Sequence, residues 1–202
     1  MPTRILAVLL TLFLSQAVLA QDFPALHRVT GVSASDVLNI RAEPDARAPI
    51  VGAFSPGQVG IEVIGLNEDR TWGLVRSGDG VGWSSMRFLA REHAESWRDG
   101  GQSLTCSGTE PFWTLSLFLP SNRAEYVSPD DSFEMRTDAP VLPSTAFPPT
   151  LALPFSGARE GVAVVRNGVC SDGMSDRLYG LEVQVYWRGQ AQGLTGCCTL
   201  GH

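Results

Sequence analysis

Apolar and polar residues alternate along most of the chain, in short runs that are broken by turn residues at intervals of roughly 8 to 12 positions. Alternation with a period of two is typical of strands that bury one face, and many short strands of this kind indicate a sandwich or a small barrel. Helix-permissive sequence is confined to residues 86–97. The pattern predicts an all-β protein with two small domains, at 22–90 and 103–202, joined by a linker at 91–102.

The N-terminal segment has the features of a signal peptide. Arg4 precedes an apolar run from Ile5 to Leu14 that is too short to span a bilayer comfortably, and the small Ala20 suits a signal peptidase. A lipid anchor would need a Cys directly after the cut, where the chain has Gln21. We therefore expect residues 1–20 to be removed by cleavage after Ala20, which leaves a periplasmic or secreted protein without stable membrane insertion.

The first domain contains five short amphipathic runs. In the first of them, Leu38 and Ile40 fall on one face of a strand, and Asn39 and Arg41 fall on the other. The other four runs lie at 50–52, 59–63, 72–76 and 81–89. Turn residues separate consecutive runs, so the pattern predicts a meander of short strands.

This domain resembles the bacterial SH3-like domain over nearly its whole length. The residues that carry the resemblance are, in chain order, Leu38-Asn39-Ile40-Arg41, Pro44, Gly57, Trp72, Gly82-Trp83 and Phe88-Leu89. The resemblance implies a small SH3-like barrel. Members of that family commonly tether envelope proteins to cell-wall peptides or other extended ligands, so it also implies a binding module rather than an enzyme.

Four residues of the first domain are candidates for ligand binding: Asn39, Arg41, Trp72 and Trp83. Aromatic faces and a guanidinium beside short loops are suited to holding an extended peptide. The alternative is structural, because aromatic residues in a tiny barrel are usually core, Asn39 can hydrogen-bond a neighbouring loop, and Arg41 can be a solvated charge. None of these residues has a defensible catalytic role.

The second domain has two strongly alternating runs, at 112–119 and 181–188, and each predicts a strand with one buried face. Shorter runs at 161–167 and 192–198 add further strands. The segment 139–154 contains five prolines and is expected to be a long loop, because proline cannot donate to a strand ladder. The simplest architecture is a small antiparallel β-barrel or half-barrel.

The four cysteines of the chain all lie in the second domain: Cys106, Cys170, Cys197 and Cys198. In an exported chain an even number of cysteines is read first as disulfides, and three pairings are possible here. If Cys197 and Cys198 lie in a strand, their side chains point to opposite faces, so each should seek a distant partner. We favour Cys170–Cys197 and Cys106–Cys198. A metal site using the adjacent pair and His202 is the alternative, but a Cys-x-x-Cys spacing is missing, so we expect no metal and no cofactor.

Three sequence blocks resemble a family of uncharacterised bacterial envelope proteins and lipoproteins. They are Cys106-Ser107-Gly108-Thr109-Glu110-Pro111-Phe112-Trp113, Cys170-Ser171-Asp172-Gly173-Met174-Ser175-Asp176-Arg177 with Tyr179, and Gly193-Leu194 with Gly196-Cys197. The chain departs from that family in lacking a lipid-anchor Cys and in carrying two adjacent cysteines near its end. The resemblance implies an envelope location and no particular activity.

These blocks contain a second candidate site, made of Glu110, Trp113, Asp172, Asp176 and Arg177. If the three carboxylates converge, with Arg177 tuning them, they would suit the acid–base chemistry of a cell-wall-directed hydrolase. The alternative is that Asp172 forms a turn with the following glycine, that Asp176 caps a backbone or pairs with Arg177, and that Glu110 introduces a strand.

Charge narrows the range of partners. The chain has 15 basic and 21 acidic residues, without a basic stripe, which disfavours nucleic acids and anionic membranes. We expect an exported, non-enzymatic envelope protein whose SH3-like domain binds a cell-wall peptide or a protein partner. The alternatives are the hydrolase described above and an inhibitor or structural partner of an envelope enzyme.

Overall fold

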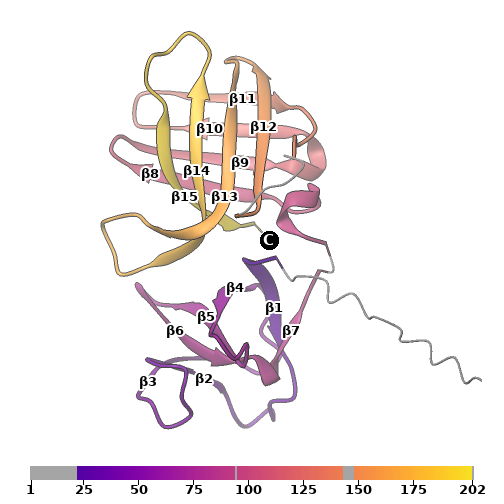
Figure 1. Ribbon diagram of the computed structural model, residues 1–202, viewed down its shortest axis with the longest axis vertical. Coiled ribbons are helices and arrows are strands. Elements are labelled where there is room, and N and C mark those ends of the chain that lie inside the picture. The colour runs from indigo at the N-terminus through magenta and orange to yellow at the C-terminus, as the bar shows by residue number, and fades with distance from the viewer. Residues whose placement is uncertain (1–21, 94, 143–147, 202) are drawn as a thin grey trace, which may run out of the picture.

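The computed structural model describes residues 22–93, 95–142 and 148–201, and it consists of two all-β regions. In Figure 1 a closed eight-stranded barrel lies above a seven-stranded antiparallel sheet. The all-β class predicted from the alternation is therefore confirmed. Among the described residues, no helix is long and apolar enough to cross a membrane.

The N-terminal sheet has the strand order β3-β2-β6-β5-β4-β1-β7. Its strands are β1 (Ala25–Val29), β2 (Leu38–Arg41), β3 (Ile50–Phe54), β4 (Ile61–Leu66), β5 (Trp72–Ser77), β6 (Gly80–Ser85) and β7 (Leu89–Arg91). The five runs expected from the sequence correspond to β2 through β6. Two further strands, β1 and β7, pair with each other and place β1 between β4 and β7.

A small apolar cluster forms the core of this sheet. Ile40, Ile61, Val63, Val75 and Leu89 are all buried in it. The inward position of Ile40 on β2 follows the alternation of the sequence, with Asn39 and Arg41 on the opposite face and half-buried.

The helix-permissive stretch at 86–97 contains no α-helix among its described residues. It forms a 3-10 turn, η1 (Met86–Phe88), then β7, and then the start of a second 3-10 turn, η2 (Trp97–Asp99). Ser96 caps η2, because its hydroxyl accepts a hydrogen bond from the backbone of Arg98 and its own N–H donates to the Asp99 carboxylate. The connection between the two regions is therefore a structured turn.

The C-terminal region is an up-and-down barrel in which β15 pairs with β8 and closes the ring. Its strands are β8 (Leu104–Thr109), β9 (Phe112–Phe118), β10 (Arg123–Val127), β11 (Ser132–Thr137), β12 (Thr150–Gly157), β13 (Gly161–Ser171), β14 (Leu178–Trp187) and β15 (Leu194–Leu200). A 3-10 turn, η3 (Leu119–Ser121), links β9 to β10. Of the two predicted architectures, the structure is the complete barrel.

Side chains fill the barrel interior. The inward-facing residues of β9, of the start of η3 and of β14 are those that the alternation predicts. They are Trp113, Leu115, Leu117, Leu119, Leu181, Val183, Val185 and Trp187. The indole of Trp113 packs against the backbone of Gly108 and Gly196, where a larger residue would leave no room for the ring. The glycines of the first and third sequence blocks therefore have a packing role.

The proline-rich segment differs in part from the predicted loop. Strand β12 begins at Thr150 and runs through Pro154, which lies opposite Val162 of β13 and accepts a hydrogen bond from Asp138 through its carbonyl oxygen. Val141 also forms an isolated bridge with Ala152. Only part of 139–154 is therefore loop, and residues 143–147 lie outside the described part of the chain.

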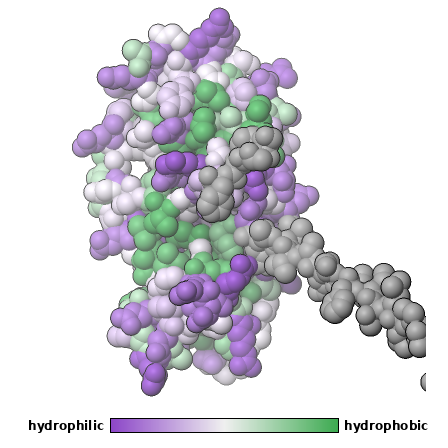
Figure 2. All heavy atoms as spheres, viewed as in Figure 1, coloured by the Kyte–Doolittle hydropathy of each residue, from purple (hydrophilic) through white to green (hydrophobic). Residues whose placement is uncertain are grey.

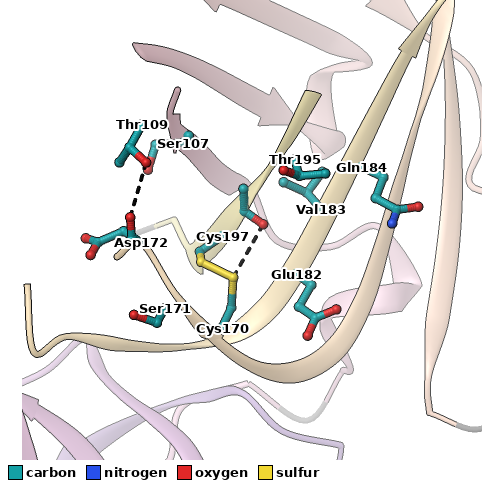
Figure 3. A pocket seen from close by; sticks show the side chains of 12 residues that line it. Ser107, Thr109, Cys170, Ser171, Asp172, Glu182, Val183, Gln184, Thr195 and Cys197 are labelled. Carbon is teal, nitrogen blue, oxygen red and sulfur yellow. Dashed lines mark hydrogen bonds between the residues drawn. A yellow bond between two sulfur atoms is a disulfide. The ribbon is translucent and has the colours of Figure 1, made fainter. Parts of the chain in front are cut away.

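Two disulfides join Cys106 to Cys198 and Cys170 to Cys197. The first links the neighbouring strands β8 and β15 inside the barrel, and the second, on the outer surface, links β13 to β15 (Figure 3). Disulfides persist in oxidising compartments, so this pair indicates an extracytoplasmic location. The predicted signal peptide, at residues 1–20, lies outside the described residues.

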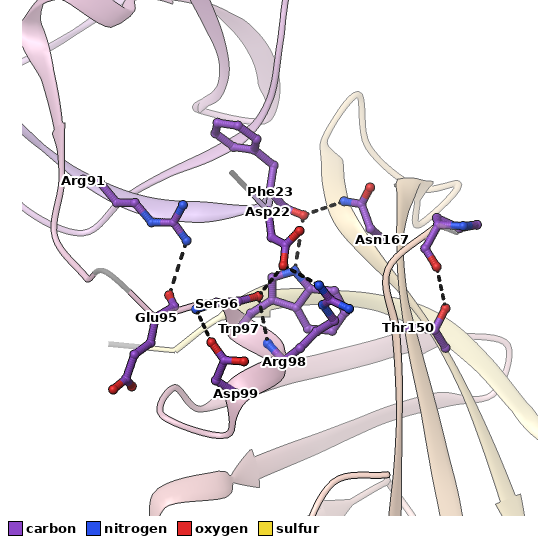
Figure 4. A network of polar contacts seen from close by, with 11 residues as sticks. Asp22, Phe23, Arg91, Glu95, Ser96, Trp97, Arg98, Asp99, Thr150 and Asn167 are labelled. Atoms are coloured by element: carbon purple, nitrogen blue, oxygen red, sulfur yellow. Dashed lines mark hydrogen bonds and ion pairs between the residues drawn. The ribbon is translucent and has the colours of Figure 1, made fainter. Parts of the chain in front are cut away.

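The two regions pack closely together where the chain enters β1. Leu26 belongs to the apolar core of the barrel, and the ring of Pro24 lies against Gly180 of β14. The carbonyl oxygen of Phe23 accepts hydrogen bonds from the Trp97 indole at 3.3 Å and from the Asn167 amide at 2.6 Å (Figure 4). Apolar residues gather across the middle of the face in Figure 2, whereas polar residues are concentrated toward both ends.

Candidate functional site

A groove of about 580 Å³ on the N-terminal sheet contains three of the four residues that the sequence suggests for ligand binding. The groove is bordered by the loop that joins β1 to β2, by strand β2 and by the turn η1. Its lining residues are Gly31, Val32, Ser33, Asp36, Val37, Leu38, Asn39, Arg41, Ala46, Trp72, Ser85, Arg87 and Phe88.

Local backbone contacts form one wall of the groove. The N–H of Thr30 donates to the carbonyl oxygen of Phe88 at 2.9 Å, which fastens the β1–β2 loop to η1. Gly31 follows with a φ of +68°, in the left-handed region that favours glycine, and the loop turns there. Further along, the N–H of Asp36 donates to the carbonyl oxygen of Ser33 at 3.0 Å and closes a second turn. The wall is thus held by backbone hydrogen bonds.

The groove carries charge of both signs. Arg41 donates one hydrogen bond to the carbonyl oxygen of Ala48 at 2.7 Å, which ties its guanidinium to the loop between β2 and β3. The guanidinium of Arg87 lies 5.5 Å from the centre of the Phe88 ring. Among the described residues, neither arginine has a carboxylate within salt-bridge distance. Asp36 supplies the acidic group, and one of its oxygens accepts from the N–H of Val37.

The aromatic group in the groove is Trp72, at the start of β5 and opposite Ser85 of β6. Its indole is half-buried, and its backbone N–H donates to the Asn67 side chain at 2.8 Å, which fixes the start of the strand. Within the described residues, the indole N–H of Trp72 makes no hydrogen bond. Trp72 therefore offers both an apolar face and a donor.

The sequence candidates differ in where they lie. Asn39, Arg41 and Trp72 all line the groove, whereas Trp83 pairs with Arg41 across the β2–β6 ladder and is not part of the lining. Sequence reasoning missed the contributions of Asp36, Arg87 and Phe88, which belong to a loop and a 3-10 turn. No side-chain pattern marks Asp36 or Arg87 as groove residues, because the β1–β2 loop and η1 meet through a backbone hydrogen bond.

In the second candidate site, the carboxylate of Asp172 is hydrogen-bonded by residues that follow it in its own loop and by Tyr179. Its carboxylate accepts hydrogen bonds from the backbone N–H groups of Met174 and Ser175, at 2.9 and 3.0 Å, and from the hydroxyls of Ser175 and Tyr179. The Met174 hydrogen bond is the largest of several that lower the pKa of this carboxyl. These contacts favour the ionised form and fix the turn. A general acid needs the opposite shift.

The other members of this set lie in different surroundings. Trp113 is inside the barrel and stacks on Tyr126, with ring centres 6.4 Å apart. Glu110 is exposed in the turn between β8 and β9. Asp176 borders a shallow crevice shared with Asp79, and Arg177 forms an ion pair with Asp79 at 2.6 Å. Arg177 thus connects the barrel to the β5–β6 turn of the N-terminal sheet.

A second cavity, of about 250 Å³, lies on the outer surface of the barrel (Figure 3). The three sequence blocks meet here: Ser107 and Thr109 come from the first, Asp172 from the second, and Cys197 from the third. The hydroxyl of Thr109 donates to the carbonyl oxygen of Asp172 at 3.2 Å. The Cys170–Cys197 disulfide forms part of the cavity wall.

In the described part of the chain, no three His, Cys, Asp or Glu side chains gather as a metal-binding group. Comparisons with protein-family models, with curated proteins and with solved structures find no match to this chain. The groove and the cavity are therefore the features of this chain that bear on its function.

Proposed function

We propose that this is an exported, non-enzymatic envelope protein whose N-terminal domain, an SH3-like module, binds a peptide of the cell wall. The observation that carries the proposal is the groove in which Asn39, Arg41 and Trp72 converge. These residues were selected from the sequence pattern alone, on β2 and β5, and they line one concave surface.

The chemistry of the groove supports an extended ligand with carboxylate groups. Arg41 and Arg87 provide guanidinium donors that match carboxylates, and Asp36 provides a partner for an amine. Val37, Leu38 and Phe88 add apolar surface for short side chains or the peptide backbone. A short peptide with carboxylates and one amine, such as the stem peptide of a bacterial wall, has this combination of groups.

Sedimentation with purified, insoluble peptidoglycan tests the proposal. The mature full-length protein should co-sediment, and Trp72→Ala and the double substitution Arg41→Ala with Arg87→Ala should each reduce the bound fraction by about tenfold or more. Deleting residues 22–90 is a poor test, because Leu26 and Pro24 are part of the contact with the barrel.

Arg136→Ala is the matched control, because Arg136 is an exposed cation on β11, outside the groove. It should bind like the unmodified protein. The folding of each variant is first checked by thermal unfolding. If Trp72→Ala is not folded at the temperature of the assay, Trp72→Phe takes its place. Binding that is equal in the groove variants and in the control would overturn the proposed site, and the absence of any co-sedimentation would overturn the proposed ligand.

A further inference from the structure

The two disulfides differ sharply in their access to solvent. Cys106 and Cys198 are completely buried inside the barrel. Cys170 is partly exposed and, with Cys197, lines the surface cavity of about 250 Å³. Cys197 is itself only 2 % exposed, so Cys170 is the more accessible cysteine of this bridge. One bridge therefore borders a surface cavity, whereas the other is enclosed in the barrel.

The accessible bridge fastens an arm to the barrel. This arm, residues 167–180, is the far end of the β13–β14 hairpin, and it curls across the outer face of the barrel in Figure 3. The ladder between β13 and β14 is interrupted between Asn167 and Cys170. Beyond that point the arm is held to the barrel wall by the Cys170–Cys197 bridge and by the hydrogen bond from Thr109 to Asp172.

The same arm contacts the N-terminal sheet. Arg177 forms its ion pair with Asp79 and also donates to the carbonyl oxygen of Gly78. At the base of the arm, Asn167 donates to Phe23, and Gly180 packs against Pro24. The bridge therefore fixes the element through which the barrel holds the β5–β6 turn.

We propose that Cys170–Cys197 is a site of thiol–disulfide exchange with an external dithiol, and that its reduction releases the arm while Cys106–Cys198 keeps the barrel closed. The cavity admits the attacking thiolate to Cys170, and the buried Cys197 is the leaving group.

The exchange proceeds in two steps and yields two protein thiols. A thiolate of the external dithiol attacks the Sγ of Cys170, the Cys170–Cys197 bond breaks, and Cys197 leaves as a thiolate that takes up a proton. The second thiol of the partner, as its thiolate, then attacks the mixed disulfide and releases Cys170, which is also protonated. The protein gains two hydrogen atoms as two thiols, and the dithiol is oxidised to a disulfide.

Differential alkylation of the mature, full-length protein tests this site. The oxidised protein is treated with increasing dithiothreitol, free thiols are alkylated, and peptides are mapped by mass spectrometry. Cys170 and Cys197 should be alkylated at least about tenfold faster than Cys106 and Cys198. Equal rates for all four cysteines, or reduction only at denaturant concentrations that unfold the chain, would overturn the proposal.

Two variants distinguish the accessibility of the Cys170–Cys197 disulfide in the folded protein from its intrinsic ease of reduction. Thr195→Trp places a bulky side chain at the cavity and should slow the reduction of Cys170–Cys197, without changing its reduction in unfolded protein. Thr105→Trp, an exposed position on β8 outside the cavity, is the matched control. Unchanged kinetics in folded Thr195→Trp would show that the cavity is not the route.

A third experiment identifies the class of dithiol that reacts and the structural consequence of reduction. Reduced thioredoxin whose second cysteine is replaced by Ser should form a trapped mixed disulfide with Cys170 if protein dithiols can reach the site, whereas reaction with dithiothreitol alone would restrict the site to small dithiols. Amide hydrogen exchange should increase in 168–180 and 77–80 on reduction. Exchange that does not change there would contradict the release of the arm.

Discussion

The carboxylate of Glu62 lies 3.3 Å from the guanidinium of Arg76, in the place where β4 of the N-terminal sheet meets the barrel. Only 3 % of the Glu62 side chain is exposed, and one of its oxygens has no hydrogen-bond partner among the described residues. Burial raises the pKa of Glu62 to about 7, although Arg76 and the backbone of Leu200 act in the opposite direction. The junction between the two regions therefore contains a carboxyl that titrates near neutral pH.

We predict that this carboxyl makes the protein less stable as the pH rises from 4.5 to about 7. The folded state retains the Glu62 proton up to about pH 7, whereas the unfolded state releases it near 4.5, so the stabilisation is complete below 4.5 and is lost at the upper value. Glu62→Gln keeps the side chain neutral. Relative to the unmodified protein, it should gain about 3 kcal/mol in the free energy of unfolding between the two ends of this range.

Urea unfolding at several pH values measures this difference. Comparison with the unmodified protein removes the contribution of other titrating groups, including His27, whose pKa is lowered mainly by burial. The exposed Glu68→Gln is the matched control and should follow the unmodified protein at every pH. Parallel curves for Glu62→Gln and the unmodified protein would contradict the prediction.

A second prediction concerns the glycines beneath Trp113. A Cβ at Gly108 would lie 2.3 Å from the indole nitrogen of Trp113 and 2.6 Å from the carbonyl oxygen of Thr195. A Cβ at Gly196 would lie 2.1 Å from the carbonyl oxygen of Ser107. Because backbone atoms cannot move away as a flexible side chain does, each Gly→Ala substitution should cost about 3 kcal/mol or prevent folding.

The control is Gly65→Ala on β4, where an added Cβ would meet nothing within 4 Å. Its free energy of unfolding should stay within about 1 kcal/mol of that of the unmodified protein. Urea unfolding followed by tryptophan fluorescence measures all three variants. If Gly108→Ala is as stable as Gly65→Ala, the packing role assigned to the first and third sequence blocks is wrong.

The alternation of residues predicted β9 and β14, which have one face in the barrel core and the other outside it. Shorter strands with the same pattern, β8, β10 and β11, were not predicted. Leu115 and Leu117, and Val183 and Val185, are buried as their spacing requires. Strand β1 was not predicted, because most of its residues are buried and it does not alternate between buried and exposed positions. Leu26 faces the barrel, while its neighbours on both sides are also buried, so the strand contacts protein on both faces.

Two further differences have local causes. Pro154 lies inside β12 one residue past the last pair with β11, Thr137–Phe155, and its carbonyl oxygen accepts from Asp138 there, so its missing N–H falls where that ladder has ended. The groove residues Asp36 and Arg87 belong to a loop and a turn that meet through a backbone hydrogen bond, which no side-chain pattern records. The strand-borne part of the groove could therefore be predicted, and the loop-borne part could not.

A third prediction concerns Trp97 in the connection between the two regions. Its side chain is 1 % exposed within the barrel core, and its indole donates to the carbonyl oxygen of Phe23. Trp97→Ala would leave a large cavity and remove one of the two hydrogen bonds to the Phe23 carbonyl oxygen, so it should cost about 3 to 5 kcal/mol in urea unfolding. Trp83→Ala, at a half-buried position outside the barrel core, should cost less. An equal cost would mean that the connection does not form part of the barrel core.

The last prediction compares two kinds of contact between the sheet and the barrel. The ion pair of Arg177 with Asp79 is exposed, with 41 % and 87 % of the two side chains accessible. Exposed pairs contribute little, so Arg177→Ala should leave the thermal unfolding midpoint almost unchanged. Gly180 is different, because a Cβ there would already lie 3.0 Å from three atoms of the Pro24 ring. The branched side chain of Gly180→Val should therefore displace Pro24.

This displacement should lower the free energy of unfolding by about 1 to 3 kcal/mol and increase amide hydrogen exchange in β1, which follows Pro24 directly. Arg177→Ala should increase exchange only around residues 77–80. The two variants thus separate apolar packing from charge pairing at one junction. If Arg177→Ala lowers the midpoint more than Gly180→Val does, charge rather than packing holds the sheet to the barrel, and the arm matters more to stability than its exposed ion pair indicates.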